Sequence, residues 1–247
     1  MVVRWPSIAR GGEVSVATRE SRRGIVIVGP AGVGKTTLAR TLASDGGESG
    51  DHRTPLWAVG TESSADVPLG AFANLVDIGA TDNPETALAG AYASLRAKDA
   101  TIVVDDADLL DPLSLILVRQ LVEDGSIRLI VTVGSGGATT HITETLADGM
   151  LPRIELGPFT REQSVQAIEA ALEGPLDEVS AEWVWDVSEG NPLYLRHLVE
   201  GSWEADLLHL VDGVWQLRAP PVATTALTTL IGSRLRNVTP DALVPRV

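Results

Sequence analysis

The chain has 247 residues and a mass of 26.0 kDa, of which 44% are hydrophobic and 21% charged, enough for one large or two small globular domains. Thirty-three acidic residues outnumber nineteen basic ones, so the net charge is −14 and the isoelectric point is about 4.6. This charge has the wrong sign for a surface that binds nucleic acid by neutralising phosphates. The chain has no cysteine, which excludes disulfides, thiolate metal sites and thiol nucleophiles.

No segment predicts secretion or membrane insertion. The first six residues lack the apolar run of a signal peptide. No apolar stretch approaches the roughly 18 residues that a membrane-spanning helix needs. We therefore expect a soluble, cytoplasmic protein that has no membrane partner and does not bind nucleic acid directly through this segment.

The first part of the chain alternates between strand and helix patterns. Short apolar runs predict strands at 24–28, 56–60, 101–104, 128–133 and 153–156, and helical spacing predicts helices at 36–43, 85–97 and 112–123. Such alternation favours a parallel sheet with helices on both faces, because each parallel pair of strands needs a crossover connection. The sequence therefore predicts an α/β fold with a five-stranded, mainly parallel sheet.

The pattern changes after Gly157-Pro158, where strands give way to helices. Thr160 and Gln163 have the spacing of a capping box, which predicts the start of a helix. Helices are expected at about 180–188, 192–200 and 224–236, and a hairpin is expected at 207–217 around Asp212-Gly213. We predict three parts: an α/β domain at 1–157, a helical segment at 158–205, and a hairpin with a helix at 206–247.

A glycine-rich turn between the first strand and the first helix predicts a phosphate-binding loop. Residues 29–36 read Gly-Pro-Ala-Gly-Val-Gly-Lys-Thr and match the pattern G-x-x-x-x-G-K-[ST] in the context that gives it meaning. Backbone N–H groups and the helix N-terminus would face phosphate oxygens. Lys35 is expected to reach the β- and γ-phosphates, and the Thr36 hydroxyl is expected to bind Mg²⁺. The predicted nucleotide-binding residues here are Gly29, Pro30, Ala31, Gly32, Val33, Gly34, Lys35, Thr36 and Thr37.

Two acidic residues follow the apolar run at 101–104, where an open parallel sheet places its ligands. Asp105 is expected to hold Mg²⁺ through water. Asp106 is expected to orient the water that attacks the γ-phosphate, which makes it and Lys35 the candidate catalytic residues. The alternative is that these acids cap loops, as we expect of Asp108 and Asp111.

With these motifs, the chain resembles the ATP-binding region of large LuxR-type transcriptional regulators, within the STAND class of signalling NTPases related to AAA+ proteins. Five segments resemble motifs of that family: Trp5-Pro6 with Arg10 and Glu13, Pro68–Phe72, Asp105–Asp111, Gly190–Arg196 and Asp212–Trp215. The resemblance implies a P-loop NTPase that binds ATP with Mg²⁺, with Arg10 near the base and Pro192 packed by the adenine. It also implies that 158–205 is a helical lid and that 206–247 begins a winged-helix domain.

The chain departs from the family pattern at three positions. Ala9 stands where the family usually has Gly, and Asp108 stands where it has His. Gly134 replaces the arginine of a Thr-Val-Arg-Ser segment, which could sense or stabilise charge on the γ-phosphate. Losing that cation would lower the hydrolysis rate by orders of magnitude and leave binding largely intact. We therefore expect nucleotide binding with slow or impaired hydrolysis.

These observations favour an ATP-dependent signalling switch. A P-loop small-molecule kinase and a nucleotide-binding scaffold that has lost hydrolysis remain alternatives. Expected partners are ATP and ADP, a second copy of the chain, or other domains of a longer regulator. The resemblance implies that a complete regulator continues into a sensor region and a helix-turn-helix, so the chain is expected to be a piece of a longer protein or a short member of the family.

Overall fold

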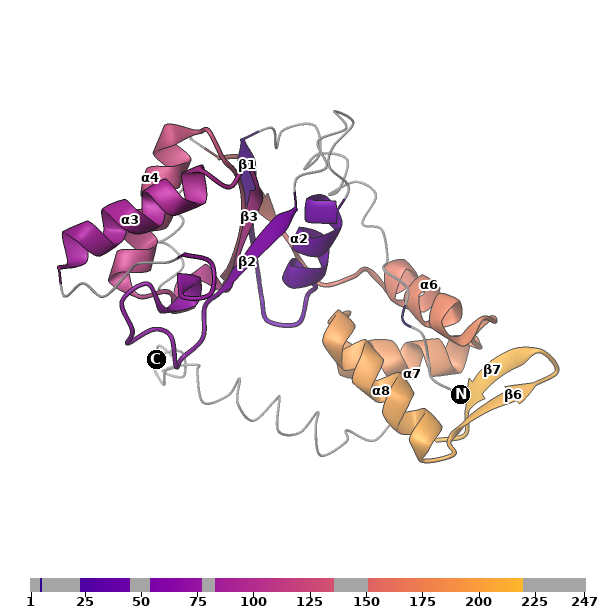
Figure 1. The fold of residues 1–247 in the computed structure, drawn as a ribbon. Helices are drawn as coiled ribbons and strands as arrows, with labels where there is room; N and C mark the ends of the chain where they lie inside the picture. The colour runs from indigo at the N-terminus through magenta and orange to yellow at the C-terminus, as the bar shows by residue number, and fades with distance from the viewer. Residues whose placement is uncertain (1–4, 6–22, 45–53, 77–82, 136–150, 220–247) are drawn as a thin grey trace, which may run out of the picture. The chain divides into compact units, whose positions relative to one another are not determined.

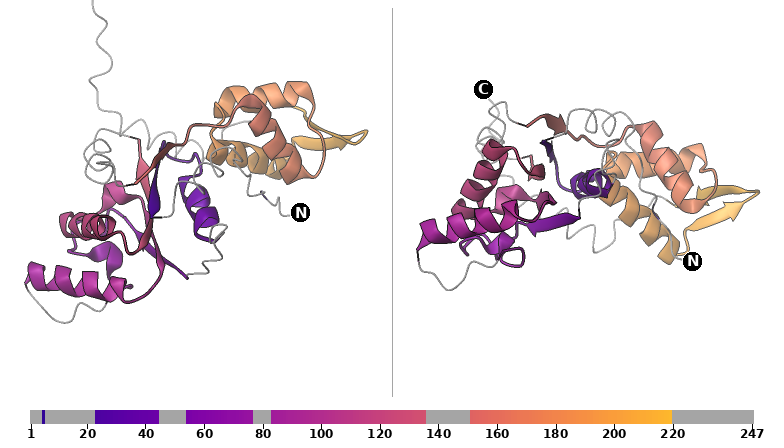
Figure 2. Two further views of the ribbon diagram at one scale, coloured as in Figure 1. Left: turned by 90° about the horizontal axis from the view of Figure 1, so that it is seen from above. Right: turned by 45° about the horizontal axis from the view of Figure 1, so that its top comes forward.

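The structure is a computed structural model that describes residues 5, 23–44, 54–76, 83–135 and 151–219. These residues divide into two compact units, Ala9–Gly157 and Met1–Ile8 with Pro158–Val247. Each unit is described by itself, and Figures 1 and 2 show the elements of both. Among the described residues, no helix is both long and apolar enough to cross a bilayer.

The unit Ala9–Gly157 is built on a parallel sheet. Its strands are β1 (Gly24–Gly29), β2 (Pro55–Val59), β3 (Thr101–Asp105), β4 (Arg128–Gly134) and β5 (Arg153–Glu155). They lie in the order β2-β3-β4-β1-β5, and every pairing between neighbours is parallel. The predicted five-stranded α/β fold of a P-loop NTPase is confirmed.

Helices cover both faces of this sheet, so the central strands are buried on both sides. Helix α2 (Lys35–Ser44) lies on one face, and α3 (Pro84–Arg96) and α4 (Pro112–Asp124) lie on the other (Figure 1). Alternate side chains of β1 enter opposite cores, as a strand's period of two requires: Ile25 and Ile27 join the α2 core, whereas Val26 and Val28 join the α3 and α4 core.

Side-chain caps set the starts of α3 and α4. Asn83 accepts hydrogen bonds from the first free N–H groups of α3, Asp111 does the same for α4, and each helix begins with proline at its first position. Asp111 is buried, and its Oδ1 also accepts from the Leu69 N–H at 3.1 Å. Asp111, which we expected to cap a loop, therefore caps α4 and also fixes the segment that follows β2.

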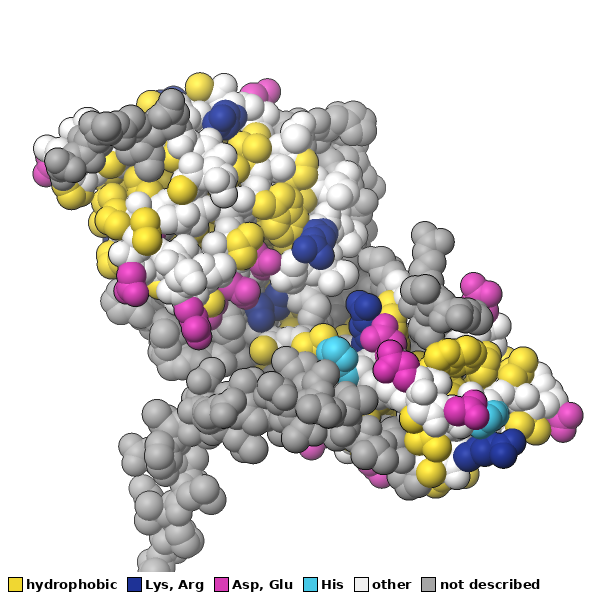
Figure 3. All heavy atoms as spheres, turned by 60° about the horizontal axis from the view of Figure 1, so that its bottom comes forward, with side chains coloured by type: hydrophobic (Ala, Val, Ile, Leu, Met, Phe, Trp, Pro, Cys, Tyr) yellow, Lys and Arg dark blue, Asp and Glu magenta, His cyan; other side chains and the backbone are white. Residues whose placement is uncertain are grey.

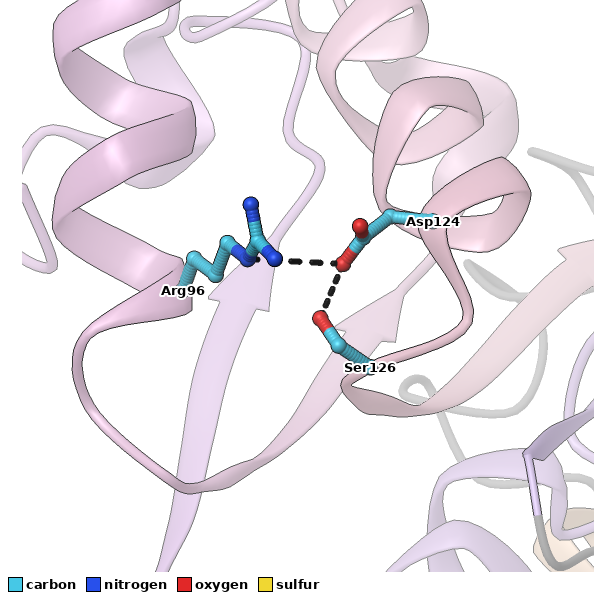
Figure 4. Close-up of polar contacts among 3 residues, drawn as sticks. All are labelled: Arg96, Asp124 and Ser126. Carbon is cyan, nitrogen blue, oxygen red and sulfur yellow. Dashed lines mark hydrogen bonds and ion pairs between the residues drawn. The ribbon is translucent and has the colours of Figure 1, made fainter.

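The C-terminal ends of α3 and α4 contact each other near the N-terminal ends of the strands. Arg96 Nε lies 3.8 Å from Asp124 Oδ2, and the Ser126 hydroxyl donates to the same carboxylate (Figure 4). The bond from Ser126 is the main reason that the pKa of Asp124 lies below its ordinary value, and Arg96 adds to it. This contact therefore lies at the other end of the strands from their carboxyl ends, and its role is structural.

The second unit is a small helical body with a hairpin. It contains α6 (Arg161–Leu172), α7 (Glu178–Ser188), α8 (Pro192–Glu204), β6 (Leu208–Val211) and β7 (Val214–Leu217). The predicted capping box of Thr160 and Gln163 is confirmed, since each side chain binds the other residue's backbone N–H. The predicted helix at 224–236 lies outside the described residues.

An apolar core of aromatic and aliphatic residues holds the second unit together. Trp203 packs edge-on against Trp215 with ring centroids 5.5 Å apart, and Trp215 Nε1 donates to the Leu172 carbonyl at 3.0 Å. Asp212 and Gly213 both have positive φ, as a two-residue hairpin turn requires. Trp5 packs against this core, although the predicted boundary assigns it to the α/β domain.

The described basic side chains do not gather into one patch on the face drawn in Figure 3. On the face drawn in Figure 3, the described Lys and Arg side chains lie apart from one another among acidic, hydrophobic and neutral groups. Among the described residues, the most exposed large hydrophobic side chains are those of Leu210, Val179 and Val67, which lie on β6, on α7 and in the segment after β2.

Candidate functional site

The loop between β1 and α2 has the backbone that a phosphate cradle needs. Gly32 and Gly34 have φ of 82° and 99°, a region that favours glycine. A side chain on Gly29 would place its Cβ 2.4 Å from the Leu156 carbonyl oxygen, so the end of β5 packs directly on the start of the loop. A Cβ on Gly34 would meet nothing within 4 Å, so open space lies beside the loop.

The predicted lysine and threonine lie at the first turn of α2. Lys35 is 7% exposed, and its Nζ donates to the Pro30 carbonyl at 3.1 Å, so the ammonium folds back over the loop. The Thr36 hydroxyl lies 2.9 Å and 3.1 Å from the two carboxylate oxygens of Asp105. The fold therefore brings together the loop and the end of β3, which are 69 residues apart at this contact.

Asp105 ends β3 and is 6% exposed. Besides the Thr36 hydroxyl, its Oδ1 accepts from Thr132 Oγ1 at 2.6 Å. Mg²⁺ prefers oxygen ligands and is usually held by one or two protein groups together with phosphate oxygens and water. The hydroxyl of Thr36 and the carboxylate of Asp105 form such a pair, so the residues present fit this ion.

Asp106 has an unusual backbone, with φ 51° and ψ 54° in the left-handed region. Its N–H donates to Thr132 Oγ1 at 2.9 Å, and its carbonyl accepts from the Leu109 N–H at 3.0 Å. Burial raises the pKa of Asp106, and the charge of Asp105 adds to this, whereas Lys35 opposes it. Left-handed non-glycine residues cost free energy and cluster at functional sites.

Thr132 belongs to this constellation, and the sequence patterns alone did not place it among the site residues. It is fully buried on β4 and contacts both Asp105 and Asp106 through its hydroxyl. The available signal was a lone polar residue near the end of the apolar run Leu-Ile-Val-Thr-Val. A polar group buried in a central strand needs a partner, and here the partners are at the end of β3.

The end of β4 carries a carboxylate contact at Gly134. Gly134 pairs in register with Gly29, which begins the loop. Its N–H donates to Asp108 Oδ1 at 2.8 Å, and a Cβ on Gly134 would lie 3.1 Å from Asp108 Oδ2. Asp108 therefore reaches from η2 (Ala107–Leu109) to the neighbouring strand beside the loop.

The two predicted adenine contacts, Arg10 and Pro192, both stay predictions. Arg10 lies outside the described residues. Pro192 is the first residue of α8, where Asn191 caps the helix by accepting from the Leu193 N–H at 3.1 Å. Gly190 has positive φ, and a Cβ there would lie 2.2 Å from the Phe159 carbonyl oxygen. The Gly-Asn-Pro segment therefore shapes the second unit, and contact of Pro192 with adenine stays a prediction.

Comparisons with known proteins agree with the loop and the sheet. Residues 18–139 match the model of a family described as an AAA domain. Among solved structures, RuvB of Thermotoga maritima is 17% identical with a TM-score of 0.56, over 93% of this chain and 72% of that one. The ORC1 protein of Aeropyrum pernix, solved in complex with DNA, is 15% identical with a TM-score of 0.59, over 94% and 67%. None of the curated proteins matches the sequence.

At these identities, the likeness to solved structures shows the fold alone. The glycine-rich loop between β1 and α2 and the parallel order of the strands define a P-loop nucleotide-binding domain. The family match narrows the class of this domain: residues 18–139 form a P-loop domain of the AAA type.

Proposed function

We propose that the chain is an ATP- and Mg²⁺-binding signalling switch of the STAND type, the nucleotide-sensing module of a LuxR-type transcriptional regulator. The observation that carries this proposal is the contact between the Thr36 hydroxyl and the Asp105 carboxylate at 2.9 Å. It brings the phosphate-binding loop and the metal-binding strand end within one hydrogen bond of each other. The motifs shared with LuxR-type regulators support the regulatory context.

In the proposed bound state, each residue has a separate task. Loop N–H groups and Lys35 bind the phosphates, while Thr36 and Asp105 hold the Mg²⁺ that neutralises phosphate charge. Asp106 orients a water molecule and accepts its proton, which its raised pKa favours. The ligands are ATP and ADP, and the helical segment at 158–205 acts as the lid.

Slow hydrolysis is part of the proposal. A cation that stabilises charge on the transferred phosphoryl group accelerates hydrolysis by about 10³ to 10⁵ in related P-loop enzymes. At the end of β4 this chain has Gly134, and its backbone N–H donates to the carboxylate of Asp108 at 2.8 Å. With glycine and a carboxylate at the place of that cation, hydrolysis is expected to be slow, so that the ATP state is long-lived, as a switch needs.

Hydrogen exchange tests the switch. We expect the chain with Mg²⁺ and a non-hydrolysable ATP analogue to differ from the chain with Mg²⁺ and ADP in the protection of α6, α7 and α8. The two ligands differ in the γ-phosphate, so contacts to that group must favour one arrangement of the chain over the other. Equal protection in the two states at saturating nucleotide would contradict a switch. Self-association and contacts with other domains of a longer regulator are the proposed readouts.

A second candidate is a nucleotide-binding scaffold without hydrolysis, which the carboxylate of Asp108 beside Gly134 favours. Single-turnover phosphate release separates the two. Slow cleavage that is lost in Asp106→Asn excludes the scaffold, whereas no cleavage by the unaltered chain over hours supports it. Rapid phosphate transfer to a small acceptor would favour the third possibility, a small-molecule kinase.

A further inference from the structure

We propose that Thr132 is a positioning residue that holds the carboxylate of Asp105 and the backbone of Asp106 in one geometry, and thereby sets the affinity of the nucleotide site for Mg²⁺. The proposal rests on the proposed function, because it concerns how the same site holds its cation. It adds a residue on β4 to the loop and the β3 end.

The Thr132 hydroxyl makes two hydrogen bonds of opposite sense. It donates to Asp105 Oδ1 at 2.6 Å and accepts from the Asp106 N–H at 2.9 Å. A hydroxyl has one hydrogen and two lone pairs, so both bonds form together. The side chain has no exposed surface, so water does not compete for either bond. Thr132 therefore fixes two consecutive residues at once.

The position of Thr132 in the sheet explains its reach. It pairs in register with Ile27 of β1 and shares a sheet face with Ile130, which packs in the core beneath α2. Thr36, on the first turn of α2, approaches Asp105 from the same side. Two threonine hydroxyls, one from a helix and one from a strand, thus bind one carboxylate.

The two threonines have different proposed roles toward Mg²⁺. Thr36 Oγ1 is the proposed Mg²⁺ ligand, so its geometry depends on the ion. Thr132 is not a proposed ligand, and its bond to Asp105 stays available when the ion is held. Partners that orient metal ligands in this way typically contribute about 10- to 100-fold to metal affinity.

The second role of Thr132 is to hold the backbone of Asp106. The left-handed backbone of Asp106 is costly on its own, and the bond from its N–H to Thr132 helps to hold it. Without the hydroxyl, the peptide group between Asp105 and Asp106 loses its fixed partner and can rotate. Loss of Thr132 is therefore expected to disturb the Mg²⁺-binding carboxylate and the orientation of Asp106 together.

The experiment separates positioning from general stability. Affinity for a fluorescent non-hydrolysable ATP analogue is measured in EDTA and across a Mg²⁺ titration. For Thr132→Val, which keeps the shape and loses the hydroxyl, we expect the affinity in EDTA to stay within about twofold and the Mg²⁺ midpoint to rise about 10- to 100-fold. Thr132→Ser, which keeps the hydroxyl, should restore the midpoint.

A matched control removes a hydroxyl elsewhere in the sheet. Thr101 is 3% exposed and begins β3, at the opposite end of the strand from Asp105, so Thr101→Val should leave the Mg²⁺ midpoint unchanged. The proposal is overturned if Thr132→Val shifts the midpoint less than about threefold, or weakens binding in EDTA as much as in Mg²⁺. Thr132→Cys, whose thiol is a weaker donor, should give an intermediate shift, and an unchanged midpoint in this variant also overturns the proposal.

Failure of the proposed function would look different. If the unaltered chain binds the analogue neither in EDTA nor with Mg²⁺, nucleotide binding itself is wrong, and the role of Thr132 falls with it. If the unaltered chain binds with a Mg²⁺-dependent gain that Thr132→Val retains, only the role of Thr132 is wrong.

Discussion

Gly60, directly after β2, packs against the carbonyl of Asp106, and a single methyl group there tests the backbone geometry of the site. A Cβ on Gly60 would lie 2.2 Å from Asp106 O, well inside the 3.0 Å below which real Cβ contacts are essentially never seen. The φ of Gly60 is not positive, so its backbone would accept alanine. Gly60→Ala should therefore destabilise the fold through a steric clash between the new Cβ and the carbonyl oxygen of Asp106.

The expected magnitude follows from which atom the new methyl group meets. Overpacking a close-packed interior costs about 1 to 3 kcal/mol. The upper end applies here, because the Asp106 carbonyl is backbone and accepts from the Leu109 N–H. Gly90 is the matched control, since it lies inside α3, is exposed, and would place a Cβ in open space with no atom within 4 Å. Gly90→Ala should stabilise by about 1 kcal/mol.

Thermal unfolding followed by circular dichroism measures the difference. The two variants should differ by about 4 kcal/mol, which corresponds to roughly 8 to 16 °C in Tm at about 2 to 4 °C per kcal/mol for a chain of this size. Gly60→Ala should melt below the unaltered chain and Gly90→Ala above it. If the two variants melt within about 2 °C of each other, the close approach of Gly60 to Asp106 is refuted.

Three further substitutions test separate parts of the site unit. Asp106→Asn should raise Tm at pH 7 and lose this gain as the pH falls to the ordinary carboxyl pKa of 3.8, because a pKa raised by burial makes the ionised form destabilising above it. Asp111→Ala should cost about 2 to 3 kcal/mol in urea unfolding, since it removes a helix cap and the buried partner of Leu69. Asp177→Ala removes a similar cap, with the same kind of bond from a serine hydroxyl but no partner like Leu69, and should cost about 1 kcal/mol. Asp108→Asn keeps a hydrogen-bond acceptor and removes a charge, so affinity for ATP relative to ADP should rise roughly three- to tenfold in calorimetric titrations, and an unchanged ratio would place Asp108 outside the reach of the γ-phosphate.

Local patterns were enough to predict the strands, the phosphate-binding loop and the capping box of Thr160 and Gln163. The β-branched run before Gly29 and the spacing of Gly34, Lys35 and Thr36 are properties of neighbouring residues, so they can be found without knowledge of the fold. Asp105 was predicted for the same reason, because it follows a continuous apolar run. Its contact with Thr36 could only be inferred from motif order.

The contacts that refine the site join residues far apart in the chain. Thr132 meets Asp105 and Asp106 across 27 and 26 positions, and the bond from Gly134 to Asp108 spans 26. Register between neighbouring strands decides these pairs, and a single sequence does not state that register. The left-handed backbone of Asp106 is likewise not stated by the sequence, since Asp can adopt this conformation but does so at only some of its positions.

The central claim is that the loop at 29–36 binds ATP with Mg²⁺, and Lys35 is the residue that tests it most directly. Isothermal titration of ATP with Mg²⁺ should show binding by the unaltered chain and at least about tenfold weaker binding by Lys35→Ala, because a charge-assisted hydrogen bond contributes about 1.5 to 3 kcal/mol. The other lysine of the chain, Lys98, is exposed, so Lys98→Ala should bind as the unaltered chain does. If Lys35→Ala binds ATP as tightly as the unaltered chain, the site is wrongly assigned.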